Sequence, residues 1–395
     1  MSQRRDLILV GGGLANGLIA WRLKQRHPDL SVVMLEAGER AGGNHTWSFH
    51  ESDLDAAQLE RIDALVAHRW PGYDVRFPER TRTLPGGYLS ITAERFAAAL
   101  EAALGDDLRT RTGVAEVAPD HVMLASGERL DAAAVIDGRG YRPSAHLTVG
   151  FQAFVGQQWR LDAPHGLERP ILMDATVDQQ GGYRFVYSLP LSPTELLIED
   201  THYVDDAGLD ADRARDNIRR YAADQGWELA TLVREERGSL PITLAGNFDA
   251  FWAPLSGQPT SGLRAGLFHA TTGYSLPAAL TLADRISERM PLAAPDLAAL
   301  IQRFAADQWR EQGFFRMLNR MLFLAGRPDE RFRVMQRFYG LETGLIERFY
   351  AGHPRLADKA RVLIGKPPVP VGEAVQAVLK RSPRLKDFQC KTDLQ

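Results

Sequence analysis

The sequence predicts an α/β fold that begins with a Rossmann-type nucleotide-binding unit. It continues in an α+β manner through an antiparallel sheet to a helical C-terminal region. Three observations at the N-terminus carry the first part of this prediction. Residues 6–10 form a short apolar run that three glycines follow at once. Residues 14–23 have helical spacing, and the apolar run 31–35 ends in Glu36. This order is that of a βαβ unit with a glycine turn at its first crossover.

The glycine turn has a physical role that other residues fulfil poorly. Glycines let the backbone approach a pyrophosphate, and the free N–H groups of the following helix attract phosphate. Glu36 lies 23 positions after Gly13, near the usual offset for a carboxylate that binds ribose hydroxyls. Asn16 replaces the third glycine of the usual G-x-G-x-x-G pattern, with Gly17 next to it. The alternative is a glycine-rich turn in an unrelated α/β protein. The predicted cofactor contacts in this unit are Gly11, Gly12, Gly13, Leu14, Ala15, Asn16 and Glu36.

Length and composition limit the possible classes of protein. The 395 residues exceed one typical core, which indicates two or three packed domains. A net charge of −3 gives no electrostatic reason to expect a nucleic-acid partner. The single cysteine, Cys390, excludes an intrachain disulfide and a cysteine-cluster metal site, and we predict no metal. The first apolar run is already the nucleotide-binding strand, so we expect no secretory signal and a cytoplasmic location. No stretch predicts a convincing transmembrane helix.

The next segments extend the nucleotide-binding domain. The glycine pair 42–43 follows the ribose carboxylate, as in FAD enzymes of the glutathione-reductase type, although an ordinary glycine turn is the alternative. A strand over 88–91 precedes a helix over 93–104, and a later strand ends in the pair Asp137-Gly138. This order is typical of flavin-monooxygenase-like folds, in which such an Asp-Gly pair lies near the phosphates. It predicts an FAD-binding domain of the glutathione-reductase/flavin-monooxygenase type.

From about residue 144 the composition changes to that of an antiparallel sheet with a substrate pocket. A helix with a charged outer face is predicted over 210–225. The predicted strands, rich in apolar and aromatic residues, are 151–155, 170–174, 183–190 and 195–200.

The chain then returns to the nucleotide. Residues 262–270 predict a strand, and 271–277 predict a turn that places Pro277 in the first turn of a helix. In flavoproteins of this class the last FAD segment has this shape, and its helix dipole points at the isoalloxazine ring. The predicted cofactor contacts of the two returning segments are Asp137, Gly138, Thr272, Gly273 and Tyr274.

The remainder, from about Pro295, predicts helices. A dense Phe/Met/Leu cluster over 314–324 is interleaved with Arg316, Arg320 and Arg327. It predicts either a helical cap on the core or an apolar gateway that docks on a membrane. The predicted domains are an FAD-binding domain (1–143 and 262–294), a substrate-binding antiparallel insert (144–261) and a helical, possibly membrane-facing cap (295–395).

Three motifs give the chain a family resemblance. They are Gly-Gly-Gly-Leu-Ala-Asn-Gly-Leu-Ile-Ala at 11–20, Leu-Ile-Glu-Asp-Thr at 197–201 and Gly-Phe-Phe-Arg-Met-Leu-Asn-Arg-Met-Leu-Phe at 313–323. With them the chain resembles the bacterial lycopene β-cyclases over nearly its whole length, and Asn16 belongs to that family's pattern. The resemblance implies an isomerase that converts the linear ψ ends of lycopene to β-ionone rings, giving γ-carotene and then β-carotene. It also implies reduced FAD as the cofactor, NAD(P)H as electron donor, and lycopene and other linear carotenoids as substrates.

Ring closure needs a proton at C2 of the substrate, and a carboxylic acid kept neutral in an apolar pocket can supply it. The resemblance implies Glu199 as this acid or acid–base group. Asp200 points to the opposite face of a strand and is expected to orient a neighbour or brace the loop. Glu199 and Asp200 are the predicted catalytic residues; movement of the proton by reduced flavin is the alternative. The candidate pocket aromatics are Trp47, Tyr183, Phe185 and Tyr274. His45 and His269 are candidate flavin neighbours, although a structural role is the expectation for both.

Two other functions fit parts of the sequence. A flavin monooxygenase or isoprenoid reductase on the same scaffold would share every FAD motif. A non-catalytic prenyl carrier, such as the Rab escort and dissociation-inhibitor proteins on a related fold, would not need the intact glycines and Glu36. Because lycopene is dissolved in membranes, the resemblance also implies peripheral association with the inner face of the cell membrane. The oligomeric state is left open.

Overall fold

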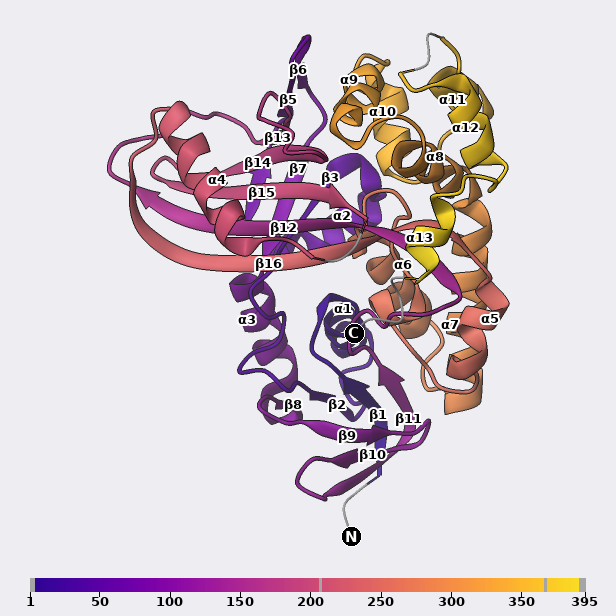
Figure 1. Ribbon diagram of the computed structural model, residues 1–395. Coiled ribbons are helices and arrows are strands. Elements are labelled where there is room, and N and C mark those ends of the chain that lie inside the picture. Colours follow the sequence, from indigo (N-terminus) through magenta and orange to yellow (C-terminus); the bar gives the residue numbers. More distant parts are fainter. Residues whose placement is uncertain (1–3, 206–207, 366–367, 391–395) are drawn as a thin grey trace.

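The N-terminal sheet forms the base of the molecule in the computed structural model, which describes residues 4–205, 208–365 and 368–390 (Figure 1). Its six strands have the order β8-β2-β1-β11-β10-β9. Strand β1 pairs in parallel with β2 and with β11, so the predicted βαβ unit is confirmed. The carboxyl ends of these strands meet at one edge, where open α/β sheets bind ligands. The strands are β1 (Arg5–Val10), β2 (Val32–Leu35), β8 (Leu108–Arg109), β9 (Val114–Val117), β10 (His121–Leu124) and β11 (Arg129–Asp137).

Helices α1 (Leu14–Arg26), α3 (Ala93–Leu104) and α6 (Leu276–Ser287) pack around this sheet. A Cβ atom at Gly17 would stand 2.4 Å from the Phe96 ring, so α1 approaches α3 closely only because residue 17 is glycine. Close packing is the role of the third glycine in a Rossmann turn. The chain therefore keeps that function one position later than the usual pattern.

A seven-stranded sheet lies above the nucleotide-binding unit in Figure 1. The four strands predicted after residue 144 are confirmed, and β12, β14 and β15 are antiparallel neighbours. The 18-residue strand β16 was not predicted, and β5 and β6 join this sheet from the N-terminal part of the chain. In spatial order the strands are β16 (Leu229–Gly246), β12 (Leu147–Leu161), β15 (Glu195–Val204), β14 (Tyr183–Ser192), β13 (Ile171–Asp174), β5 (Tyr73–Phe77) and β6 (Arg80–Leu84).

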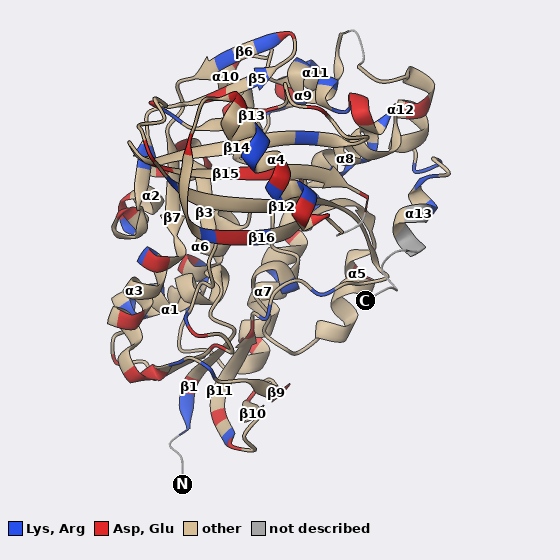
Figure 2. Cartoon of the chain, turned by 60° about the vertical axis from the view of Figure 1, so that its left-hand side comes forward, with Lys and Arg blue, Asp and Glu red and all other residues tan. Residues whose placement is uncertain are grey.

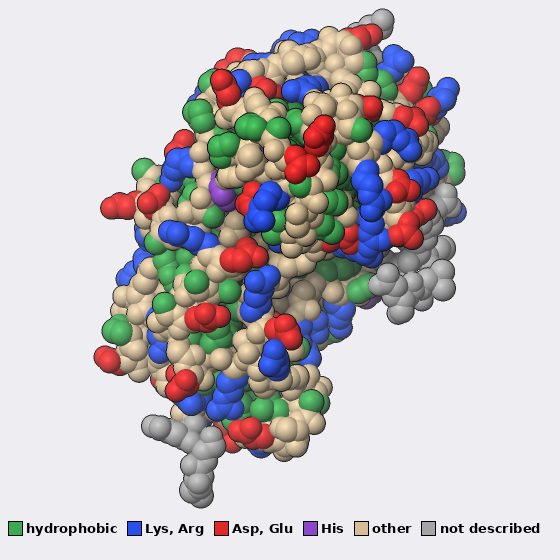
Figure 3. Space-filling model, turned by 90° about the vertical axis from the view of Figure 1, so that its left-hand side faces the viewer, with side chains coloured by type: hydrophobic (Ala, Val, Ile, Leu, Met, Phe, Trp, Pro, Cys, Tyr) green, Lys and Arg blue, Asp and Glu red, His purple; other side chains and the backbone are tan. Residues whose placement is uncertain are grey.

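Helix α4 (Ala211–Asp224) covers one face of this sheet, where it contacts β12 and β15. Its N-cap is Asp210, whose carboxylate accepts a hydrogen bond from the Arg213 amide at 3.1 Å. Figure 2 shows residues of both charge signs on α4 and on β16. On the face in Figure 3, Lys and Arg side chains are interspersed with Asp and Glu.

A small three-stranded sheet and the C-terminal helices complete the fold. The helices α8 to α12 gather beside the seven-stranded sheet (Figure 1). The strands of the small sheet are β3 (Thr46–His50), β4 (His68–Trp70) and β7 (Tyr88–Thr92). The remaining helices are α2 (Ala56–Ile62), α5 (Phe248–Trp252), α7 (Ala294–Glu311), α8 (Gly313–Leu324), α9 (Phe332–Phe338), α10 (Thr343–Tyr350), α11 (Leu356–Leu363), α12 (Val371–Val378) and α13 (Leu385–Cys390).

The prediction of a strand over residues 262–270 is wrong. The segment begins with a 3₁₀ turn, Gly262–Ala265, and continues as a loop. Gly262 (φ +61°) and Gly266 (φ +70°) both have positive φ, which an extended strand does not allow. Ala265, Leu267, Phe268 and Ala270 are buried by packing and not by pairing in a sheet.

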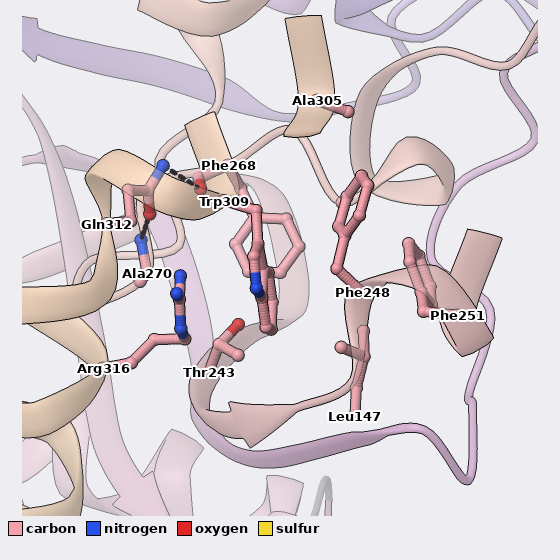
Figure 4. A pocket seen from close by; sticks show the side chains of 11 residues that line it. Leu147, Thr243, Phe248, Phe251, Phe268, Ala270, Ala305, Trp309, Gln312 and Arg316 are labelled. Atoms are coloured by element: carbon pink, nitrogen blue, oxygen red, sulfur yellow. Dashed lines mark hydrogen bonds between the residues drawn. The ribbon is translucent and has the colours of Figure 1, made fainter. Parts of the chain in front are cut away.

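Helix α8 carries the Phe/Met/Leu cluster that predicted a membrane gateway, and most of it belongs to the core. Arg320 is 7% exposed and donates to the carbonyl oxygens of Leu244 at 2.7 Å and Ala377 at 3.0 Å. Arg316 lies over the Trp309 ring at 3.8 Å from its centroid (Figure 4). These two arginines are therefore unsuited to membrane docking. The buried apolar residues of α8 are Phe315, Leu322, Phe323 and Leu324.

Within the described ranges, no helix has both the length and the apolar character to cross a bilayer. The same residues contain no group of three or more His, Cys, Asp or Glu side chains arranged to hold a metal ion.

Candidate active site

A groove of about 640 Å³ runs along the carboxyl edge of β1 and β2. It includes the first turn of α1, which contains no acidic residue. A Cβ atom at Gly13 would meet nothing within 4 Å, so the N-terminus of α1 is open to a ligand. Free N–H groups and the helix dipole make this end of α1 a favourable place for phosphate. The predicted cofactor residues that line the groove are Gly11, Gly13, Leu14, Ala15, Glu36 and Gly138.

Glu36 ends β2 at the predicted ribose position. Its carboxylate accepts hydrogen bonds from the amides of Gly12 at 2.7 Å and Gly38 at 2.6 Å. Gly11 has φ +90°, and a Cβ there would lie 3.0 Å from the Gly138 carbonyl oxygen. The turn therefore requires glycine, and the two predicted phosphate segments lie against one another.

Three predicted cofactor residues support the groove without lining it, and one of them is Gly12, whose amide donates to Glu36. Asn16 is 1% exposed and donates to the carbonyl oxygens of Val10 and Gly11 at 2.9 and 3.0 Å. The Asp137 carboxylate is buried in ion pairs of 2.9 Å with Arg139 and with Arg264. These contacts brace the turn and the end of β11. The asparagine that breaks the usual fingerprint thus has a structural role.

A second cavity, of about 220 Å³, adjoins the groove. Ser275, the N-cap of α6, lines both spaces, as do Trp47 and Leu263. The predicted contacts Thr272, Gly273 and Tyr274 line this second cavity and not the groove. The helix end that was expected to face a flavin ring therefore lies where the two spaces meet.

The walls of the second cavity are largely aromatic. Of the predicted pocket aromatics, Trp47, Phe185 and Tyr274 line it. Tyr183 does not, although its hydroxyl contacts the sulfur of Met173, a residue of the cavity wall. His45 lines both spaces, whereas the His269 ring lines neither and packs against the Phe315 ring, with 4.4 Å between the centroids. The aromatic residues that the sequence did not single out are Phe154, Tyr187, Tyr203 and Tyr350.

Glu199 brings a carboxyl group to this aromatic cavity. It lies on β15 and is 9% exposed, and it accepts a hydrogen bond from the Thr201 hydroxyl at 2.6 Å. Burial, and second to it the nearby charge of Glu236, raise the pKa of Glu199 to about 8. At neutral pH the group is therefore a protonated acid that can donate a proton.

Asp200 projects to the other face of β15, as strand alternation predicts. It is fully buried and accepts hydrogen bonds from Arg184 at 2.6 Å, His202 at 2.8 Å and Asn217 of α4 at 2.8 Å. Burial alone would raise the pKa of Asp200, but His202 and Arg184 lower it overall. Asp200 is an ionised brace between β15, β14 and α4, outside the cavity.

These features define the class of protein: an α/β protein with a Rossmann-type nucleotide-binding fold. A Rossmann-type phosphate-binding groove opens onto an aromatic cavity that contains one neutral carboxylic acid among its described lining residues. The overall fold is shared with p-nitrophenol 4-monooxygenase from Pseudomonas putida (TM-score 0.60, 15% identity, 90% of this chain and 100% of that chain). It is also shared with a geranylgeranyl bacteriochlorophyll reductase-like protein from Thermoplasma acidophilum (TM-score 0.55, 12% identity, 98% and 99%). At these identities the likeness concerns the fold alone.

Sequence comparison identifies the family. Residues 6–376 match the family described as lycopene cyclase protein. The lycopene beta-cyclase of Pseudescherichia vulneris is 60% identical over 383 residues, which cover 97% of this chain and 99% of that protein. The lycopene beta-cyclase of a Paracoccus species is 46% identical over 384 residues, with the same coverage. The chain belongs to the lycopene cyclase family, and the family predicted from the three motifs is confirmed.

Proposed function

We propose that this protein is a lycopene β-cyclase, an isomerase that closes the linear ψ ends of lycopene into β-ionone rings. The products are γ-carotene and then β-carotene. The observation that carries the proposal is a buried, neutral Glu199 in an aromatic cavity, on a chain 60% identical to a protein named for this activity. Because ring closure changes no oxidation state, the product is an isomer of its substrate.

The residues around the groove fit FAD. The open N-terminus of α1, from Gly11 to Ala15, would hold the pyrophosphate, and Glu36 would hold the ribose hydroxyls. The N-terminus of α6, with no acidic residue in its first turn, favours a negatively charged ring system at the junction of the two spaces. Reduced FAD, with NAD(P)H as electron donor, would supply an electron-rich neighbour for a cationic substrate.

The protein's own residues can carry the proton chemistry. Glu199 donates its proton to C2 of the terminal double bond, which leaves a tertiary cation at C1. The C5–C6 double bond attacks C1 through C6, which moves the cation to C5. The Glu199 carboxylate then takes the proton from C6, which gives the β ring and restores the acid. The aromatic faces of Trp47, Phe185 and Tyr274 stabilise the cation and keep water away from it.

The mass of the product tests this function against the alternatives. Lycopene is incubated with the protein, FAD and NADPH without oxygen, and the carotenoids are analysed by chromatography and mass spectrometry. A cyclase gives a carotenoid of unchanged mass that absorbs at shorter wavelength. A gain of hydrogen would indicate a reductase, and a gain of oxygen after air is admitted would indicate a monooxygenase. Binding without any product would indicate a carrier.

The three domains, with limits at residues 143, 261 and 294, remain our proposal for how these tasks are divided. Strands β5 and β6 extend the substrate sheet from within the first of these segments. Because these two strands come from the first predicted domain and pair in the sheet of the second, the two domains share one sheet beside the cavity.

A membrane-dissolved substrate needs a docking surface, and helices α11 and α12 offer one. Val371 and Val375 share one side of α12 and are 62% and 51% exposed, and Ile364 after α11 is 64% exposed. Lys380 and Arg381 follow α12 and are exposed, which suits an anionic lipid surface. We place the peripheral contact with the inner face of the cell membrane here and not on α8.

An apolar cavity of about 120 Å³ lies under this surface, between α8, α9 and α11. Leu363 lines it and is 45% exposed, so it stands at the mouth. Thr271 and Phe349 line its inner end, and their chain neighbours Thr272 and Tyr350 line the Glu199 cavity. We propose that a carotenoid passes from the bilayer toward the acid by way of these two neighbouring cavities.

We predict that Val371→Asp combined with Val375→Asp reduces cosedimentation with anionic liposomes at least several-fold, because two charges would enter the headgroup region. The matched control is Leu232→Asp with Val233→Asp, which changes two exposed apolar residues of β16 away from this surface. Equal sedimentation of the two double variants would contradict the assigned face.

A further inference from the structure

A second buried carboxyl group stands close to Glu199. Glu236 lies on β16 and is 3% exposed, although glutamate is rarely buried without a partner. On β12, Gly156 pairs with Glu199 of β15 on one side and with Glu236 of β16 on the other. Directly opposite residues of antiparallel strands share one face of the sheet. The two glutamates therefore form one row with a glycine between them.

The missing side chain at Gly156 allows the two glutamates to approach each other. A Cβ atom there would lie 3.1 Å from Cγ of Glu236 and 3.6 Å from Cγ of Glu199. Both side chains thus border the same small space above the glycine. In such a buried space two negative charges repel strongly, so ionisation of one carboxyl disfavours ionisation of the other.

The surroundings decide which of the two carboxyls is charged. Glu236 accepts hydrogen bonds from the Thr46 amide at 3.1 Å and from Arg234 at 3.3 Å, and both partners favour a carboxylate. Glu199 accepts its hydrogen bond from the Thr201 hydroxyl, which carries no charge. The negative charge is therefore better placed on Glu236 and the proton on Glu199.

We propose that Glu236 is a positioning residue for the cyclisation: its carboxylate, fixed beside Gly156 by Arg234 and the Thr46 amide, keeps the proton on Glu199. The inference rests on the proposed function, because it gives Glu199 the role of acid. Burial raises the pKa of Glu236 to about 7, and Arg234 and the Thr46 amide oppose that rise. The pKa of Glu199, at about 8, is the higher of the two, in agreement with this order.

The other titratable groups near Glu199 leave this division of charge in place. Burial raises the pKa values of Tyr187 on β14 and of Tyr274 before α6, so both phenols are neutral. Asp200 is on the same strand, and its charge is compensated by Arg184 and His202 on the opposite face.

The groups near Glu236 are Arg234 and Glu94 of α3, whose charges act on it, and His45 at 4.0 Å. Burial, and then the charge of Arg234, lower the pKa of His45. His45 is therefore neutral at pH 7. Among the described groups named here, Arg234 is the cation that holds the Glu236 charge.

The pH dependence of turnover tests the proposal. Activity of the holoenzyme on lycopene should fall as the pH rises through about 8, where Glu199 loses its proton. In Glu236→Gln the carboxylate charge is lost, so this alkaline limb should move to lower pH by about 1 unit. Glu236→Asp keeps the charge and should retain the limb near its original position. An unmoved limb in an active Glu236→Gln protein would overturn the proposal.

The neighbouring residue provides a matched control. Glu235 is paired with Arg215 at 2.8 Å and with Arg237 at 2.8 Å on the other face of β16. Glu235→Gln removes the same charge from the same strand and should leave the alkaline limb unmoved. A shift equal to that of Glu236→Gln would show a general effect of charge and would also overturn the proposal.

Infrared titration of the wild-type holoprotein gives a second test, which depends neither on the folding of the Glu236→Gln variant nor on turnover. The band of the protonated Glu199 carboxyl, identified by its loss in Glu199→Gln, should persist at pH 7 and disappear above about pH 8. If the band already disappears before the pH has risen to 6, the proposal that Glu236 keeps the proton on Glu199 is overturned. A protein that shows this titration but forms no cyclic product would instead refute the proposed function.

Discussion

Glu199→Gln should abolish cyclisation while the protein keeps its flavin. The amide is isosteric with the neutral acid but cannot give up a proton of useful acidity, so we expect turnover of lycopene to fall by about 10²- to 10⁴-fold. Flavin content should be unchanged because Glu199 lies outside the groove. The measurement is the rate of cyclic carotenoid formation per bound flavin, with absorbance reporting the flavin.

The control for this variant is Glu195→Gln on the same strand. Glu195 is the first residue of β15 and is paired with Arg160 at 3.3 Å, and its loss should leave turnover within about twofold. Full activity of Glu199→Gln would show that Glu199 is not the acid. The alternative in which reduced flavin moves the proton would then be favoured.

Asp200→Asn should destabilise the fold strongly without removing the acid. The substitution leaves Arg184, which is 4% exposed, without its charge partner. Breaking a buried pair in this way costs about 3–5 kcal/mol. We expect the urea midpoint of the holoprotein to fall, and the protein that remains folded to keep the alkaline limb of the pH profile.

An exposed pair gives the comparison. Asp216 and Arg219 on α4 are 67% and 56% exposed in their side chains, and Asp216→Asn should change the free energy of unfolding by less than about 1 kcal/mol. If both Asn variants unfold at the same urea concentration, Asp200 is not the brace described here.

The nucleotide-binding unit could be predicted because its signals are contiguous. Strand, glycine turn, helix and acidic strand end lie within residues 6–36, and each has a local physical cause. The helices predicted over 93–104 and 210–225 also have local signals, and both begin at a capping side chain that accepts a hydrogen bond from an amide three residues on.

Contacts between distant strands could not be predicted in the same way. Strand β16 carries Arg234, Glu235, Glu236 and Arg237, a polar run that gives no apolar alternation. Residues 262–270 are apolar enough for a strand, but two glycines with positive φ turn the chain. The burial of Arg320 depends on carbonyls of β16 and α12, which no local pattern reveals.

In the candidate site, too, local features could be predicted from the sequence and contacts between distant strands could not. Alternation along β15 separated Glu199 from Asp200 correctly, because opposite faces follow from the strand geometry. The row of Glu199, Gly156 and Glu236 comes from three strands, and their register is a property of the folded sheet. Sequence motifs single out Glu199, the proposed acid, but not Glu236, which we propose to keep the proton on Glu199.

Deuterium incorporation tests the central claim most directly. The protein, reduced FAD and lycopene are combined in D₂O without oxygen, with protein in excess so that each acid acts once after exchange with solvent. The account predicts one deuterium per ring, because Glu199 delivers an exchanged proton to C2 while C6 loses a carbon-bound hydrogen. The monocyclic product should gain one mass unit and the bicyclic product two. Cyclic carotenoid of unchanged mass would contradict proton delivery by an exchangeable acid.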